Sequence, residues 1–225
     1  MRDVLRLARE RMMEILRRPG NLVLSLGVTV LLSLFAAPAG VESGSLPIAV
    51  AGRLFLLATG ISGLFGYSLS GSRHANAETP SDEIVSLRGF VLGYVVSASV
   101  LATSLTWIAV GVMLIATAIR HGGSIGLEPW TLTYAACGPW IVSAAFAGAM
   151  ALARHLLRRG GRMVVAWMLF LPWMLTFAAF RLLGGLPGDP SRIVALSLLS
   201  AFALCAVEAG IFLRFIPDRL TMRPR

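Results

Sequence analysis

Six apolar segments divide this chain of 225 residues, and the arginines between them are sorted by side. If the connecting segments are taken alternately, sixteen arginines fall in one set and four in the other. Basic residues stay on the cytoplasmic side during membrane insertion, so this asymmetry predicts that both termini are cytoplasmic. The sequence therefore indicates a polytopic membrane protein. The larger set is Arg2, Arg6, Arg9, Arg11, Arg17, Arg18, Arg73, Arg88, Arg154, Arg158, Arg159, Arg162, Arg214, Arg219, Arg223 and Arg225, and the smaller set is Arg53, Arg120, Arg181 and Arg192.

The composition fits a membrane domain better than a nucleic-acid-binding protein. Apolar residues make up 56% of the chain and charged residues 14%, with a net charge of +9. The arginines flank apolar runs, where they fix orientation and meet the anionic headgroups of membrane lipid. No basic stretch with interleaved aromatic residues lies elsewhere, so we expect no nucleic-acid partner. Cys137 and Cys205 lie within apolar segments, and we expect both to be buried as small hydrophobic residues.

We predict an all-α membrane protein with six transmembrane helices, cytoplasmic N- and C-termini and an N-terminal interfacial amphipathic helix. The third span is long enough that it must tilt or extend beyond the hydrocarbon. Three regions result: the interfacial helix over 1–20, a six-helix transmembrane domain over 21–215 and a basic cytoplasmic tail over 216–225. The predicted spans are 21–37, 47–69, 89–118, 130–153, 163–180 and 193–212.

The first eighteen residues alternate charge and apolarity with a helical period. This pattern predicts a helix at the cytoplasmic interface, with its apolar stripe toward the acyl chains. Pro19 and Gly20 are expected to end it and to turn the chain into the bilayer. The helix could serve as a topogenic anchor or as a structural elbow in a larger assembly. The stripe consists of Leu5, Ala8, Met12, Ile15 and Leu16.

Catalytic motifs are missing from the sequence. A phosphate-binding loop needs a lysine, and the chain contains none, so ATP and Mg would have to be bound by a separate subunit. His74, His121 and His155 all fall in loops or at span ends, which leaves no base or HExxH zinc site deep in a span. We therefore expect no enzyme activity, no catalytic residue, no metal and no cofactor in this chain itself.

The segment between the second and third spans carries a helix-capping pattern. Thr79 can cap a short helix whose first turn contains Pro80, Asp82 and Glu83. Acidic residues suit the N-terminus of a helix, and Arg88 suits its other end. The segment is therefore predicted to form a short acidic cytoplasmic helix. Such a helix is either a solvated connector or a docking element for a cytoplasmic partner.

Four residues interrupt the apolar spans. Glu208 is a carboxyl well inside a span, where it is expected to pair with an arginine or to serve a substrate or proton. Arg53, in the outer part of the second span, can extend to the surface or attract an anionic group of a substrate. Pro139 and Pro172 remove backbone donors, which predicts kinks or breaks in the fourth and fifth spans.

The order of these parts resembles the ABC-2 type exporter permeases, and most of all the haem-exporter permease of cytochrome c maturation. The resemblance covers the whole chain by topology. Its local motifs are Arg9-Glu10-Arg11 leading to Arg17-Arg18-Pro19, Leu34-Phe35, and Leu169-Phe170-Leu171-Pro172. The chain departs from that family in two places: residues 74–88 lack its Gly-Ser/Thr-Leu-Glu run and proline-ended leucine stretch, and the exterior segment after the fifth predicted span is short for paired re-entrant helices.

The resemblance implies a permease subunit of an ABC transporter in the bacterial inner membrane. It would export a hydrophobic or amphipathic substrate, haem-related compounds being one option, together with a second permease copy or a homologous permease. An ABC ATP-binding subunit would dock on the first cytoplasmic loop and on the N-terminal helix. The alternatives are the substrate-capture subunit of a vitamin-type importer and a membrane scaffold without a transport role. The expected docking residues are Glu78, Thr79, Asp82, Glu83 and Arg88.

Overall fold

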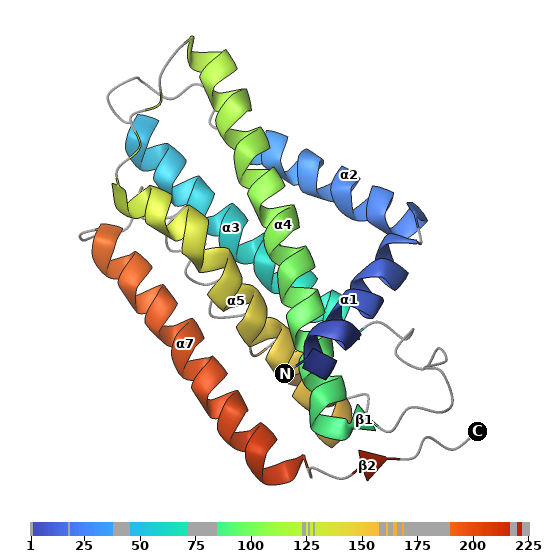
Figure 1. The fold of residues 1–225 in the computed structure, drawn as a ribbon. Helices are drawn as coiled ribbons and strands as arrows, with labels where there is room; N and C mark the ends of the chain where they lie inside the picture. Colours follow the sequence, from blue (N-terminus) through green and yellow to red (C-terminus); the bar gives the residue numbers. More distant parts are fainter. Residues whose placement is uncertain are drawn as a thin grey trace.

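A computed structural model of the chain describes residues 2–17, 19–37, 46–71, 85–122, 125, 127, 129–157, 161, 164–165, 168, 190–216 and 220–221. Its elements are helices, apart from one pair of two-residue strands (Figure 1). The elements are α1 (Arg2–Leu16), α2 (Pro19–Ala36), α3 (Leu46–Gly71), β1 (Val85–Ser86), α4 (Leu87–His121), α5 (Pro129–Leu156), α7 (Pro190–Phe215) and β2 (Leu220–Thr221).

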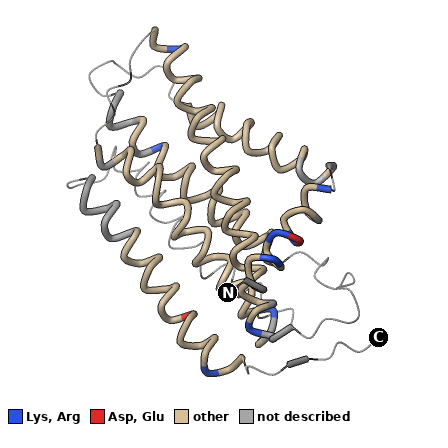
Figure 2. Tube along the Cα trace, in the orientation of Figure 1, with Lys and Arg blue, Asp and Glu red and all other residues tan. Residues whose placement is uncertain are grey.

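Three helices in the described part of the chain are long and apolar enough to cross a membrane. They contain the apolar stretches Val91–His121, Thr131–Arg154 and Leu198–Phe215. The apolar stretches of α2 and α3 are shorter, at Val23–Ala36 and Arg53–Leu69. Figure 2 shows charged residues mainly toward helix ends, with long uncharged stretches between them. The predicted fifth span, 163–180, and its Pro172 lie almost wholly outside the described residues.

The first two helices meet where the sequence predicts a turn. α1 ends at Leu16, and the Arg17 N–H still donates to the Met13 carbonyl at 2.9 Å. Pro19 then begins α2, a position that suits proline because the first helical N–H has no intrahelical partner. The helix predicted over the first eighteen residues thus ends at Leu16, and Pro19 and Gly20 lie in the first turn of α2 rather than after it.

Helices α3, α4 and α5 pack on one another to form the centre of the molecule (Figure 1). α1 and α2 contact α4, whereas α7 contacts α5. α3 approaches α5 closely at Gly66, where an added Cβ would lie 2.6 Å from the Ser143 carbonyl oxygen. Small residues permit such approaches between helices in apolar surroundings.

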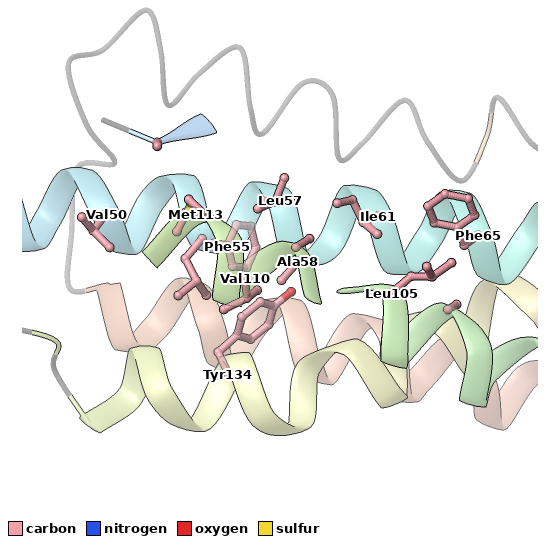
Figure 3. Packing of buried hydrophobic residues seen from close by; sticks show 14 residues of the cluster. Val50, Phe55, Leu57, Ala58, Ile61, Phe65, Leu105, Val110, Met113 and Tyr134 are labelled. Atoms are coloured by element: carbon pink, nitrogen blue, oxygen red, sulfur yellow. The ribbon is translucent and has the colours of Figure 1, made fainter. Parts of the chain in front are cut away.

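A row of apolar side chains along α3 forms the core between these helices (Figure 3). Phe55 faces Tyr134 of α5, with ring centroids 4.9 Å apart, and the Tyr134 hydroxyl is hydrogen-bonded to Thr59. Leu105 and Met113 of α4 complete the contact, and both are buried. The core therefore joins three helices and satisfies the one polar group of its central aromatic residue.

Hydroxyl groups link α4 to α5 inside the bundle. Thr103 Oγ1 and Ser143 Oγ lie 3.1 Å apart, and both residues are fully buried. The Ser143 hydroxyl also lies 3.3 Å from the Ser99 carbonyl. Hydroxyl links of this kind between helices favour helix association in apolar surroundings.

Pro139 lies inside α5, which runs as one helix from Pro129 to Leu156. Proline has no N–H, so the carbonyl four residues earlier, that of Ala135, loses its intrahelical donor. The Trp107 indole N–H of α4 donates to this carbonyl at 3.2 Å. Trp107 also meets Trp140 edge to face, with ring centroids 5.8 Å apart. The proline thus creates an acceptor that a neighbouring helix uses.

Candidate functional site

The predicted docking segment is described only at its C-terminal end. Glu78, Thr79, Asp82 and Glu83 lie outside the described residues. Arg88 does not end a separate loop helix, as predicted, but lies in the first turn of α4. Val85 and Ser86, which directly precede α4, form β1 and pair with β2, so the helix that contains Arg88 begins at Leu87.

Arg88 joins the beginning of α4 to the end of α7. Its Nε donates to the Ile216 carbonyl at 2.8 Å, and its Nη2 donates to the Leu213 carbonyl at 2.9 Å. The last carbonyls of a helix lack intrahelical partners, and an arginine can satisfy two of them at once. Arg88 therefore caps the C-terminus of α7 from a different helix.

The two strands reinforce this junction. β1 and β2 are antiparallel, with Val85 opposite Thr221 and Ser86 opposite Leu220. Ile216 is buried and packs in a cluster with Val91 and other residues of α4 and α5. Part of the predicted basic tail therefore returns to the beginning of α4, near the N-terminus of the chain (Figure 1).

Replacing Arg88 by alanine tests this junction. We expect the end of α7 and β2 to open more often, because the Leu213 and Ile216 carbonyls lose their charged donor. Hydrogen exchange in a peptide covering 213–221 should accelerate roughly fivefold or more, which corresponds to about 1 kcal/mol. An Arg9→Ala variant is the control, since Arg9 is exposed on α1. Unchanged exchange in the Arg88 variant would contradict the capping role.

α1 packs against the same region of α4. Leu7 and Ala8 are buried, and a Cβ on Gly93 of α4 would lie 3.0 Å from the Leu7 Cβ. The buried Arg11 guanidinium lies 4.8 Å from the centre of the Tyr94 ring, a cation–π geometry. The predicted apolar stripe is thus only partly the buried face. Its members Leu5 and Leu16 are exposed. The face that carries Leu7 is buried instead, because Gly93 of α4 has no side chain and lets this face come close.

Arginines also cap α2 at the other end of α4. Arg53 Nη1 donates to the Ala36 carbonyl at 3.3 Å, and Arg120 Nη1 donates to the Ala37 carbonyl at 2.9 Å. Arg53 was predicted to extend to the surface or to attract a substrate, and the structure places it at this helix end. The role of Arg120 was not predicted, since the two partners are 83 residues apart.

Glu208 lies on α7 and is buried against α5, with 8% of its surface exposed. Its Oε2 occupies the space that a side chain at Gly148 would need. Its Oε1 has no hydrogen-bond partner in the described part of the molecule. The arginine partner that the sequence suggested as one option is not found among these residues.

The two cysteines are free thiols in different surroundings. Cys137 is exposed on α5, contrary to the predicted burial, because it lies on the face of α5 turned away from the core. Cys205 is half-buried, and its Sγ lies 3.9 Å from the Ile141 carbonyl of α5. Among the described residues, no three His, Cys, Asp or Glu side chains gather in a way that could hold a metal ion.

Comparisons of the chain with protein-family models, with curated proteins and with solved structures yield no match. A functional assignment therefore has to rest on the residues and their geometry. Two places stand out: the junction of α1, α4, α7 and the strand pair, and the buried carboxyl between α5 and α7.

Proposed function

We propose that this chain is the permease subunit of an ABC transporter that exports a hydrophobic or amphipathic substrate. A separate subunit supplies ATP binding and hydrolysis. The observation that supports this most is the Arg88 junction, because it connects the proposed docking segment to two long apolar helices at once. A segment that served only to connect α3 to α4 would not need a side chain that also binds the end of α7.

In this proposal the chain crosses the bacterial inner membrane six times, with both termini cytoplasmic. The spans are α2, α3, α4, α5, the segment 163–180 and α7. The arginine asymmetry supports the orientation, because it places α1, Arg88 and the strand pair on the cytoplasmic side. That is the side on which ATP-binding subunits are available.

The junction suggests how movement of the ATPase would reach the membrane. A subunit docked on 78–83 and on α1 would displace the beginning of α4, since β1 directly precedes that helix and α1 packs on it. Arg88 would carry the displacement to α7. Small shifts at such a contact become larger rearrangements when whole helices move as rigid bodies.

Exposed apolar side chains on α2 and α7 are available to lipid and to a second permease copy. Phe35 is 76% exposed and Phe202 is 65% exposed. Two copies, or one copy and a homologous chain, would form the transport path between them. Few charges line the described helices, which favours a hydrophobic or amphipathic substrate over a hydrophilic one.

The test is to purify the protein in mild detergent from its native membrane and to identify its partners by mass spectrometry. We expect a stoichiometric ATPase carrying Walker motifs. Reversal of Asp82 and Glu83 to arginine should lower its recovery on the order of tenfold or more, since like charges would then face the docking partner. Reversal of Glu128, in a predicted exterior loop, is the matched control and should have no effect.

Other outcomes would reject the proposal. A chain that purifies without any ATPase would instead favour a membrane scaffold. An ATPase that remains bound to the doubly reversed variant would place the docking surface elsewhere than residues 78–83.

A further inference from the structure

Glu208 lies at the centre of the contact between α7 and α5. On α7, Ala201 and Cys205 precede it on the same helix face, and both contact α5. On α5, Gly148 has no side chain and leaves the room that the carboxyl group occupies. The carboxyl group is therefore held in a recess between two helices rather than exposed beside them.

No cation lies beside this carboxyl group among the described residues. On the two helices that form the recess, the nearest arginines are Arg154, six residues after Gly148, and Arg214, six residues after Glu208. Six helical residues correspond to about 9 Å along the axis, and neither guanidinium pairs with Glu208 in the described part of the molecule. The Arg214 guanidinium lies over the Phe215 ring instead, 5.9 Å from its centre. A buried carboxylate without a partner is costly, and such groups in apolar helices are usually functional.

The recess lies close to the outer surface of α7. Val207, Ala209 and Gly210, which flank Glu208 in the sequence, are all exposed. A Cβ added to Gly210 would meet nothing within 4 Å. A molecule bound on the exposed surface of α7 would therefore lie beside residues that directly flank Glu208, and the small side chains of Ala209 and Gly210 leave room next to the carboxyl group.

We propose that Glu208 and Gly148 form a binding site for the cationic group of a lipophilic organic cation. The carboxylate supplies the counter-charge, and the apolar surface of α7 beside it accommodates the hydrophobic body of the ligand. This inference names a substrate class for the proposed transport function and rests on it for its biological role. The binding itself requires only this chain.

The test uses the purified full-length chain in nanodiscs of zwitterionic lipid, with radiolabelled tetraphenylphosphonium as the probe. We expect saturable binding, with affinity at least tenfold weaker in Glu208→Gln than in the native chain. Glu10→Gln is the matched control, since Glu10 is an exposed acid on α1, and it should bind like the native chain. Tetraphenylborate, of the same shape but opposite charge, should bind equally to all three proteins.

A second pair of variants separates charge from packing. Glu208→Asp keeps the charge and should retain most of the binding. Gly148→Ala places a methyl group where the carboxyl oxygen lies and should weaken binding, with no further loss when it is combined with Glu208→Gln. If Glu208→Gln fails to fold, Glu208→Asp and Gly148→Ala still test the proposal.

Equal tetraphenylphosphonium binding by native protein and the Glu208→Gln variant would overturn the proposal, as would an absence of saturable binding. A parallel loss of tetraphenylborate binding would also overturn it, because it would indicate altered packing. If binding depends on Glu208 but no ATPase is purified with the chain, the cation site is supported and the permease assignment is rejected.

Discussion

The Gly66→Ala variant is expected to lose about 2 to 3 kcal/mol of stability, because the added methyl group overpacks the contact between α3 and α5. The added methyl carbon would lie 2.6 Å from the Ser143 carbonyl oxygen and 3.1 Å from its Cα. Both atoms belong to the backbone in the middle of α5, so neither can rotate away. Alanine has a better helix propensity than glycine by up to about 1 kcal/mol, which is too little to offset the clash.

The expected loss corresponds to a fall in melting temperature of roughly 4 to 12 °C for a chain of this size. It can be measured by thermal unfolding of the purified protein in detergent. Gly60→Ala on the same helix is the matched control, because nothing lies within 4 Å of its added Cβ. That variant should melt at or slightly above the native temperature. A Gly66→Ala protein that melts together with this control would show that α3 and α5 do not approach each other as described.

Gly93→Leu is expected to release α1 from α4 while leaving the central bundle folded. Even a methyl group at this position would lie 3.0 Å from the Leu7 Cβ and 3.5 Å from the Ala8 nitrogen. A leucine cannot fit beneath a helix that lies so close, and overpacking of this kind costs about 1 to 3 kcal/mol. Since α4 is the main contact of α1 among the described elements, the helix should move away as a unit.

Trypsin cleavage after Arg11 reports this release. Arg11 is only 6% exposed in the docked helix, so cleavage there should be slow in the native protein and faster by about fivefold or more in the variant. Gly111→Leu, also on α4, is the control, since its added Cβ would meet nothing within 4 Å. If both leucine variants are cleaved at the native rate, α1 does not depend on the contact at Gly93.

The long helices could be predicted closely from the sequence. The apolar runs 89–118 and 130–153 correspond to α4 (Leu87–His121) and α5 (Pro129–Leu156), which extend one to three residues further at each end. Hydropathy marks where a chain can be buried in an apolar environment, but a helix continues until its backbone or caps end it. For this reason the cores of the spans were predicted better than their ends.

The contacts between distant segments could not be predicted. The sequence predicts that Arg88 ends a loop helix. Its carbonyl partners lie 125 and 128 residues further along the chain, so no local pattern indicates them. Glu208 was recognised as an unusual carboxyl, yet nothing in the sequence pointed to Gly148 as the residue beside it. The buried face of α1 was predicted only in part, since helical periodicity cannot show where a neighbouring helix has a glycine.

Pro139 has an optical consequence. Because it leaves the Ala135 carbonyl to the Trp107 indole, Trp107 of α4 is held against Trp140 of α5 at an interplanar angle of 74°. Two indoles at this distance couple their electronic transitions and give a paired signal in circular dichroism. Any movement that separates the two helices would weaken this signal. The protein thus carries its own label-free indicator of the α4–α5 contact.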